Sequence, residues 1–223
     1  MGAGSGFPID LILFGMIAAF LVLRLRSILG RRTGFERPPQ PYQPPTGSTA
    51  TGPVIDGHAE PPKPATSRRL PDAAGPTGQL LARMRGIDPS FEPEAFLDGA
   101  EKAFRIIVGA FASGDRGTLR GLLSDDTYRG FEQAIAARET SGQTQVSEIR
   151  AIHCAAIEGA ELRGSVASIT VRFVSDQVNL TSDKDGHPIT GTDAVTEITD
   201  IWTFERDLST RDPVWRLVAA RSA

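Results

Sequence analysis

Residues 163–175 read RGSVASITVRFVS, and this stretch decides the fold class. Its apolar side chains alternate with polar ones, at Ala167, Ile169, Val171 and Phe173. A two-residue period is typical of a β-strand that buries one face and leaves the other to polar side chains. The apolar face of such a strand has to be covered, so we expect another element of the same domain to pack on it.

The covering element is predicted to be a helix that begins at Glu92-Pro93-Glu94, where proline and acidic residues suit a first turn. Apolar residues then follow at steps of four, four, three and four, at Phe96, Ala100, Phe104, Ile107 and Phe111. This spacing places three phenylalanines on one helical face. Two shorter helices are predicted after it, one around residues 119–123 and one over residues 126–138.

After Gly142 the apolar period changes from about 3.6 to 2, which indicates strands. Besides residues 163–175, strands are predicted over residues 146–157, 196–207 and 214–220, with a turn at Asp185-Gly186. The order of helices first and strands afterwards predicts an α+β domain over residues 87–223. In this domain a curved antiparallel sheet folds around the phenylalanine-rich helix and encloses an apolar cavity.

The N-terminal segment is apolar: residues 11–23 (LILFGMIAAFLVL) contain no charged side chain. With its flanks, residues 7–29, it is long enough to be predicted as a transmembrane anchor, which needs about 17–25 apolar residues. A cleaved signal peptide would need a preceding basic segment, and an interfacial helix would need a polar face; the sequence favours neither. The choice between a helix that spans the membrane and one that lies on it stays open.

Four arginines, Arg24, Arg26, Arg31 and Arg32, follow the apolar run on its C-terminal side. The positive-inside rule then places the rest of the chain in the cytoplasm. Residues 30–86 include PPQPYQPP and PPKP and hold few large apolar side chains, so they are predicted to form a disordered proline-rich linker.

The charge is unevenly distributed along the chain. Residues 1–86 hold ten Lys/Arg and five Asp/Glu, whereas residues 87–223 hold 14 and 22, which gives the predicted domain a net charge of −8. An acidic domain disfavours nucleic acid as a partner, because phosphate contacts need clustered cations. The basic N-terminal part suits anionic lipid instead.

The sequence shows none of the common motifs of catalysis or cofactor binding. There is no glycine-rich phosphate loop and no nucleophile elbow, and His153 and His187 lack the spacing of metal ligands. The lone Cys154 stands among apolar residues, which favours a buried packing role over a reactive thiol. No cofactor and no metal is therefore predicted.

Asp200 is the one polar side chain that suggests chemistry. It shares a predicted strand face with Ile198, Trp202 and Phe204, so a carboxylate would point into the apolar cavity and could serve as a general base. The other interpretations are a salt bridge to Arg172 or Arg216, or a position at the sheet edge open to water.

Three parts of the sequence resemble a known family. They are residues 9–32 (IDLILFGMIAAFLVLRLRSILGRR), residues 96–124 (FLDGAEKAFRIIVGAFASGDRGTLRGLLS), and ITVRF at 169–173 together with EITDIWTFER at 197–206. The chain resembles the C-terminal domain of the 44-kilodalton peripheral subunit of the mitochondrial inner-membrane translocase, and more closely the bacterial relatives called TimA. The resemblance implies a fold similar to nuclear transport factor 2, with a hydrophobic pocket lined by Phe104, Ile107, Phe111, Ile169, Val171, Trp202 and Phe204.

The resemblance also implies a function. The chain would be a non-enzymatic adaptor of the bacterial inner membrane, a single-pass protein whose cytoplasmic domain meets membrane lipid and either a protein translocase or a client polypeptide. Chaperone recruitment is not carried over, because the region before the domain is here an apolar segment and a proline linker. Two alternatives remain: an isomerase- or dehydratase-type enzyme that uses Asp200, and a ribosome-associated membrane tether.

Overall fold

The computed structural model describes residues 66–223. Within them the chain forms a short strand, four helices and then four strands. The helices are α2 (Pro76–Ile87), α3 (Pro93–Ser113), α4 (Arg116–Leu122) and α5 (Asp125–Thr140), and the strands are β1 (Ser67–Arg69), β2 (Thr144–Arg163), β3 (Val166–Ser182), β4 (Pro188–Asp207) and β5 (Arg216–Ser222). The α+β class and the order of helices before the main strands are thus as predicted.

The five strands make one sheet in the order β1-β2-β3-β4-β5. Strands β2 to β5 pair antiparallel with their neighbours, but β1 runs parallel to β2, with Ser67 opposite Cys154. The sheet is therefore mixed, and the prediction of a purely antiparallel sheet is corrected by this one strand. Strand β1 is polar and exposed, so it joins the sheet through its backbone and carries no alternating pattern that sequence reasoning could detect.

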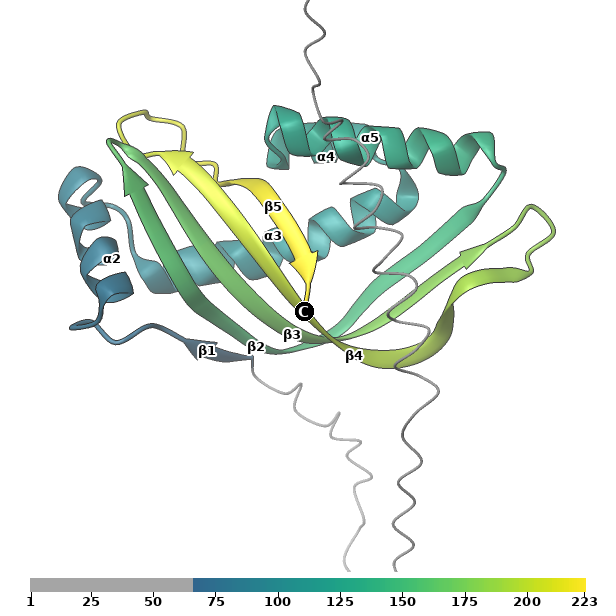
Figure 1. The fold of residues 1–223 in the computed structure, drawn as a ribbon, viewed down its shortest axis with the longest axis horizontal. Helices are drawn as coiled ribbons and strands as arrows, with labels where there is room; N and C mark the ends of the chain where they lie inside the picture. The colour runs from purple at the N-terminus through teal and green to yellow at the C-terminus, as the bar shows by residue number, and fades with distance from the viewer. Residues whose placement is uncertain (1–65) are drawn as a thin grey trace, which may run out of the picture. The chain divides into compact units, whose positions relative to one another are not determined.

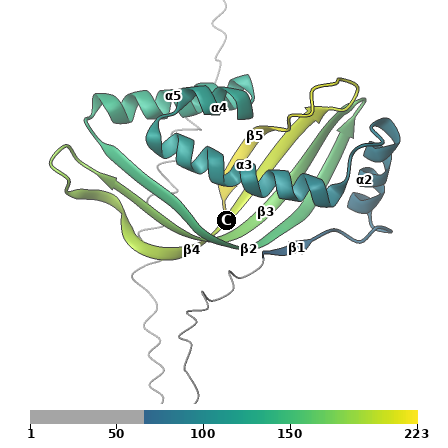
Figure 2. The same cartoon turned by 180° about the vertical axis from the view of Figure 1, so that it is seen from behind.

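The sheet curves, and three irregularities in β2 contribute to the bend. The register between β2 and β3 shifts between Ile149 and Ala151, between Ile152 and Cys154, and between Ile157 and Gly159. Each shift places an extra residue in β2, which bends the strand and increases its twist. Figures 1 and 2 show that helix α3 crosses the concave side of the sheet, with α4 and α5 above it.

Helix α3 begins as the sequence predicted. Pro93 occupies the first turn together with Glu94, and the helix ends at Gly114, whose φ of 74° puts it in the left-handed region. The Gly114 N–H donates to the carbonyls of Ala110 and Phe111, which closes the last turn in the way that favours glycine there. The buried face of α3 holds Phe96, Leu97, Ala100, Phe104, Ile107 and Ala110.

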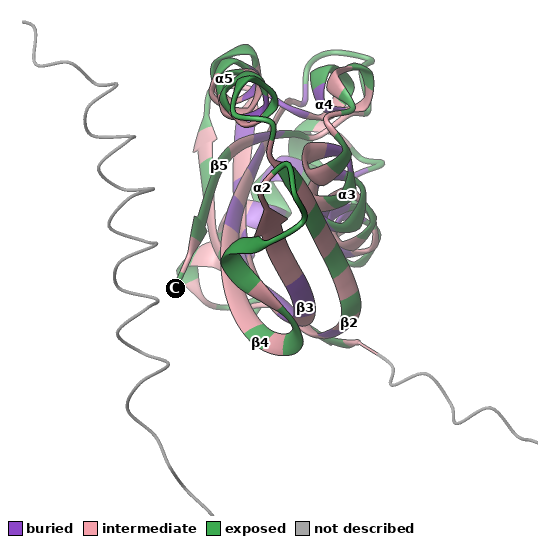
Figure 3. Ribbon diagram, turned by 90° about the vertical axis from the view of Figure 1, so that its right-hand side faces the viewer, coloured by how far each residue is buried: buried purple, intermediate pink, exposed green. Residues whose placement is uncertain are grey.

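The core lies between this face of α3 and the concave face of the sheet. Strand β3 alternates between buried and half-buried residues along most of its length, and Figure 3 colours the domain by burial. The Phe104 ring stacks on Phe173 with centroids 4.5 Å apart and meets Trp202 edge-on at 4.7 Å. These rings are almost completely buried, so they fill the space between helix and sheet.

This packing corrects the predicted pocket. Six of the seven predicted lining residues are buried core residues: Phe104, Ile107, Ile169, Val171, Trp202 and Phe204. The seventh, Phe111, is half-buried and packs edge-on against Phe131 of α5, at 4.9 Å. The sequence placed these residues on the right faces, but the large aromatic rings occupy the volume that the prediction left empty.

The start of the folded part is also corrected. The predicted linker over residues 30–86 includes β1 and all but the last residue of helix α2, which the structure shows as ordered elements. Leu81 and Met84 of α2 are buried in the core, so α2 is part of the domain. The predicted anchor and its four arginines, with the linker up to residue 65, lie outside the described residues. Among residues 66–223, no helix has the length and apolar character needed to span a membrane.

Candidate functional site

An open hollow of about 340 Å³ lies beside the N-terminal half of α3. Five parts of the chain line it: the connection between α2 and α3, one face of α3, Leu122 at the end of α4, the end of β4, and the connection between β4 and β5. The lining residues used below are Phe91, Ala95, Phe96, Gly99, Ala103, Phe204, Arg206 and Trp215. Of the seven residues predicted to line a pocket, Phe204 belongs to this set.

Small side chains on α3 explain why the hollow exists. Ala95, Gly99 and Ala103 follow one another at steps of four, so they lie in a row on one face of the helix. A Cβ atom built on Gly99 would meet no atom within 4 Å. Space is therefore left where larger side chains would have filled it.

Aromatic rings form the walls. Phe96 meets Trp215 edge-on, with centroids 4.8 Å apart, and Phe91 lies 5.8 Å from Trp215 and 6.4 Å from Phe96. Phe204 contacts Phe96 edge-on at 6.1 Å from the core side. Phe91, Phe96 and Phe204 are buried, while Trp215 is half-buried. The hollow thus offers rigid aromatic surface to an apolar group, which is the surface that contributes most to recognition sites.

One cation lines this apolar site. The Arg206 side chain, 12% exposed, forms an ion pair with Asp88 through Nη2, and its guanidinium lies 5.9 Å from the centre of the Trp215 ring. Its Nε is buried and has no hydrogen-bond partner among the described residues. An unsatisfied buried donor costs free energy, so this end of the hollow holds a polar group whose hydrogen bonding is incomplete.

Asp88 is held ionised by its neighbours. The Ser90 hydroxyl and the Ser90 N–H donate to its carboxylate, and Arg206 adds an ion pair. These hydrogen bonds, those from Ser90 foremost, lower the pKa of Asp88. The pair of Asp88 and Arg206 therefore fixes one end of the hollow at neutral pH.

Asp200, the predicted general base, lies away from these lining residues. Its Oδ2 accepts a hydrogen bond from Gln177 Nε2 at 2.7 Å, and its Oδ1 accepts one from Ser222 Oγ at 2.8 Å. Gln177 Nε2 also donates to Ser175 Oγ at 3.0 Å, and both of these residues are buried. Asp200 is thus part of a polar network at the edge of the core. Of the cations considered as its partners, Arg172 pairs with Glu158 and Arg216 with Asp212.

Among residues 66–223, two groups of carboxylates and histidine could hold a metal ion. One is Asp183, Asp185 and His187 in the turn between β3 and β4, and the other is His153, Asp176 and Glu197 on β2, β3 and β4. Neither was predicted, because neither shows the short spacing of a known motif.

Comparison with protein families decides where the chain belongs. The family model described as the Tim44-like domain matches residues 77–222. The chain belongs to the Tim44-like family. The match includes nearly all of α2, which agrees with the packing of that helix into the domain, and it confirms the resemblance found in the sequence.

Solved structures with a related outline show low sequence identity to this Tim44-like chain. The intermembrane-space region of the chloroplast protein ARC6 is 12% identical, with a TM-score of 0.44 over 60% of this chain and 98% of that one. A conserved protein from Planctomyces limnophilus is 14% identical, with a TM-score of 0.36 over 58% and 99% of the two chains. A dehydratase candidate of the NTF2-like family from Streptomyces avermitilis is 12% identical, with a TM-score of 0.35 over 58% and 97%. Comparison with curated protein sequences gave no match.

The residues of the hollow that sequence reasoning missed lie between elements, at the ends of elements, or among the small residues of α3. Phe91 and Trp215 stand in connections beside proline, and Arg206 follows the last apolar residue of its strand. Gly99 was a sequence feature that could have indicated the hollow, because a glycine inside a strongly helical pattern usually has a packing or functional role. In this Tim44-like domain the reason is the open space above it.

Proposed function

We propose that this Tim44-like protein is a membrane-anchored adaptor of protein translocation, whose domain faces the cytoplasm and receives an apolar side chain of a polypeptide partner in the hollow beside α3. Three observations support the proposal: membership of the Tim44-like family, the apolar segment followed by four arginines, and the aromatic hollow itself. The hollow is the observation that carries it, because it gives the domain a place to bind.

The size of the hollow favours a side chain over a diacyl lipid. Its volume of about 340 Å³ is near the lower end of the range of about 300–1,000 Å³ for small-molecule sites. A pocket of this size with aromatic walls suits one large apolar or aromatic side chain.

The proposal treats the domain as a binding module without catalysis. Both carboxylate oxygens of Asp200 accept hydrogen bonds from neighbouring side chains, which suits a structural carboxylate. An isomerase or dehydratase would instead need Asp200 to meet a substrate.

The adaptor hypothesis is tested by crosslinking in cells. The full chain is compared with a chain that begins at Thr66, which lacks the apolar segment but keeps β1 and α2. We expect translocase subunits or nascent chains to crosslink to the full chain, and to the shorter chain in much smaller amounts. If neither chain captures them, the adaptor hypothesis fails.

Lipid is distinguished from a polypeptide partner by flotation. The chain that begins at Thr66 is mixed with vesicles of phosphatidylethanolamine and cardiolipin, with and without an aromatic-rich peptide in excess. We expect the peptide to bind in the absence of vesicles. If the shorter chain floats with vesicles and the peptide does not bind, the hollow binds lipid and not a polypeptide side chain.

Topology is tested separately, because orientation rests on the arginines alone. A reporter that is active only in the cytoplasm, fused after Ala223, should be active. Activity of a periplasmic reporter at the same position would overturn the proposed cytoplasmic location.

A further inference from the structure

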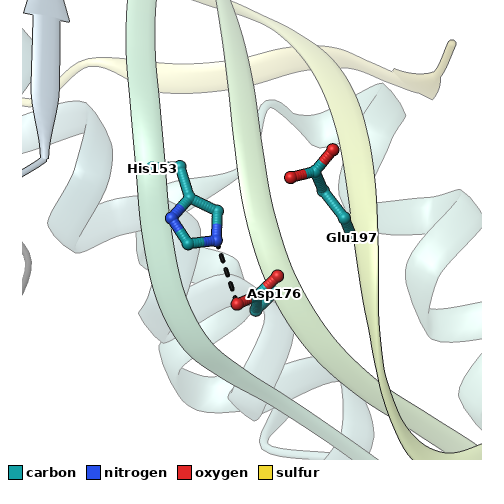
Figure 4. A group of neighbouring side chains, drawn as sticks. All are labelled: His153, Asp176 and Glu197. Carbon is teal, nitrogen blue, oxygen red and sulfur yellow. Dashed lines mark ion pairs between the residues drawn. The ribbon is translucent and has the colours of Figure 1, made fainter. Parts of the chain in front are cut away.

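A group of three titratable side chains lies on the outer face of the sheet, where three neighbouring strands meet. His153 comes from β2, Asp176 from β3 and Glu197 from β4, and Figure 4 shows the three side chains gathered on one face. The His153 Nε2 and Asp176 Oδ2 atoms are 2.9 Å apart. One ligand atom from each of the three residues lies within 4.8 Å of the others.

The fold sets these positions through register and not through sequence spacing. Asp176 stands directly opposite Glu197 in the pairing of β3 with β4. His153 is the extra residue at the register shift between Ile152 and Cys154 in β2. A bulge of this kind re-aims a side chain, and here the ring is placed beside the carboxylate on the next strand.

The charges of the group are not balanced within the described part of the chain. Two carboxylates directly opposite each other on adjacent strands destabilise the pairing. Asp176 has His153 as its ion-pair partner, whereas the Glu197 side chain forms no ion pair or hydrogen bond with any residue from 66 to 223. The arginines on these strands are engaged elsewhere: Arg150 pairs with Glu148, and Arg172 pairs with Glu158. A bound cation would remove the repulsion between the two carboxylates.

We propose that His153, Asp176 and Glu197 bind a divalent transition-metal cation, of which zinc is the representative. One imidazole nitrogen and two carboxylate oxygens are ligands that zinc accepts, with water in the remaining position. Neighbouring ligand atoms of tetrahedral zinc lie about 3.4 Å apart, and the three side chains are close enough to reach that spacing by small rotations. Magnesium should bind far less well, since it prefers an all-oxygen octahedron.

The other histidine-containing group serves as the matched control. In the turn between β3 and β4, Asp183 already accepts hydrogen bonds from the N–H groups of Asp185 and His187. The backbone donation from His187 lowers the pKa of the Asp183 carboxyl more than any other interaction. This carboxylate therefore has a structural role in the turn, and the His187 side chain is largely exposed.

The test uses the full chain in detergent with Cys154→Ser as the parent, because a free thiol next to His153 would itself bind zinc. Zinc binding is measured by isothermal titration calorimetry, and thermal unfolding is followed with and without zinc. We expect the parent to bind one zinc per chain and to unfold at a higher temperature with zinc than without it. His153→Ala and Glu197→Gln should each weaken binding by at least about tenfold, while His187→Ala should bind as the parent does.

Glu197→Gln separates a metal ligand from a structural residue. Because the Glu197 side chain has no ion-pair or hydrogen-bond partner among residues 66–223 and faces the like charge of Asp176, the metal-free variant should unfold at the same temperature as the metal-free parent or higher. The variant should also lose the shift that zinc produces in the parent. The proposal is overturned if the parent binds no zinc, if His153→Ala or Glu197→Gln binds it as tightly as the parent, or if His187→Ala alone abolishes binding.

Discussion

Replacement of Gly99 by leucine should fill the hollow while it stabilises the helix. Gly99 lies in the interior of α3, where glycine is about 0.8–1 kcal/mol less favourable than a good helix former. A Cβ at this position meets no atom within 4 Å, so the substitution brings no backbone clash. If the leucine side chain then buries about 50 Å² of apolar surface in the hollow, about 1 kcal/mol is added.

The matched control is Gly109→Leu on the same helix. Gly109 is exposed, does not line the hollow, and also has open space at its Cβ position. It should therefore gain the propensity contribution of about 0.8–1 kcal/mol without the burial. For a folded part of this size, about 3 °C per kcal/mol gives a rise in Tm of about 5 °C for Gly99→Leu and about 3 °C for Gly109→Leu.

The assay combines thermal unfolding of the full chain in detergent with binding of an aromatic-rich peptide. Gly99→Leu should be the more stable variant and should lose peptide binding, whereas Gly109→Leu should bind as the unmodified chain does. The reasoning is refuted if Gly99→Leu unfolds below Gly109→Leu, because the hollow would then not be open, or if Gly99→Leu still binds the peptide at full affinity.

Three further predictions follow from the core, the polar network and the ion pair. Phe104→Ala removes a ring stacked on Phe173 and should lower the free energy of unfolding by about 3–5 kcal/mol in urea titration; a loss below 1 kcal/mol would contradict the described core. Asp200→Asn should lower the free energy of unfolding by about 1–3 kcal/mol, because it breaks the hydrogen bonds of this carboxylate, and it should leave peptide binding intact. If the protein were an enzyme that uses Asp200, the variant would instead lose turnover of a small apolar substrate while its stability stayed unchanged. Hydrogen bonds from Ser90 and the ion pair with Arg206 lower the pKa of Asp88. The ionised Asp88 carboxylate therefore contributes fully to stability at neutral pH, and this contribution is lost as the pH falls below about 4. The stability difference between the unmodified chain and Asp88→Asn should therefore shrink between pH 7 and about pH 3 in thermal unfolding; a constant difference would show that the ionised carboxylate is not what stabilises this corner.

The sequence predicted the elements whose apolar periodicity is strong. Helix α3 and strands β3 and β4 carry regular apolar spacing over many residues, and the structure confirms the existence and type of each. Helix α2 was missed because PTGQLLARMRGI follows a proline-rich region and holds few large apolar residues, so composition assigned it to the linker. Only tertiary packing, in which Leu81 and Met84 reach the core, reveals that it belongs to the domain.

The candidate sites were less predictable than the fold, and for physical reasons. The alternation of apolar and polar residues correctly predicted which residues of β3 and β4 face the core. It does not predict whether rings such as Phe104 and Phe173 line a cavity or fill it. The hollow depends on small residues of α3 and on connections between elements, which carry no periodicity. The group of His153, Asp176 and Glu197 depends on a bulge in β2 that places His153 next to Asp176. Such a register shift cannot be detected from a single sequence.

Site-specific photo-crosslinking from the hollow tests the central claim most directly. A photoreactive residue replaces Val214, which lines the hollow, and in a second protein it replaces Ile106, which is 49% exposed on α3 and lies outside the hollow. The assay uses cells that are actively exporting protein, and crosslinked products are identified by mass spectrometry. Position 214 should crosslink to a translocase subunit or a nascent polypeptide, whereas position 106 should not. Gly99→Leu should abolish the crosslinked product from position 214. Equal crosslinking from both positions, or an undiminished product in Gly99→Leu, would contradict the claim that the hollow is where the partner binds.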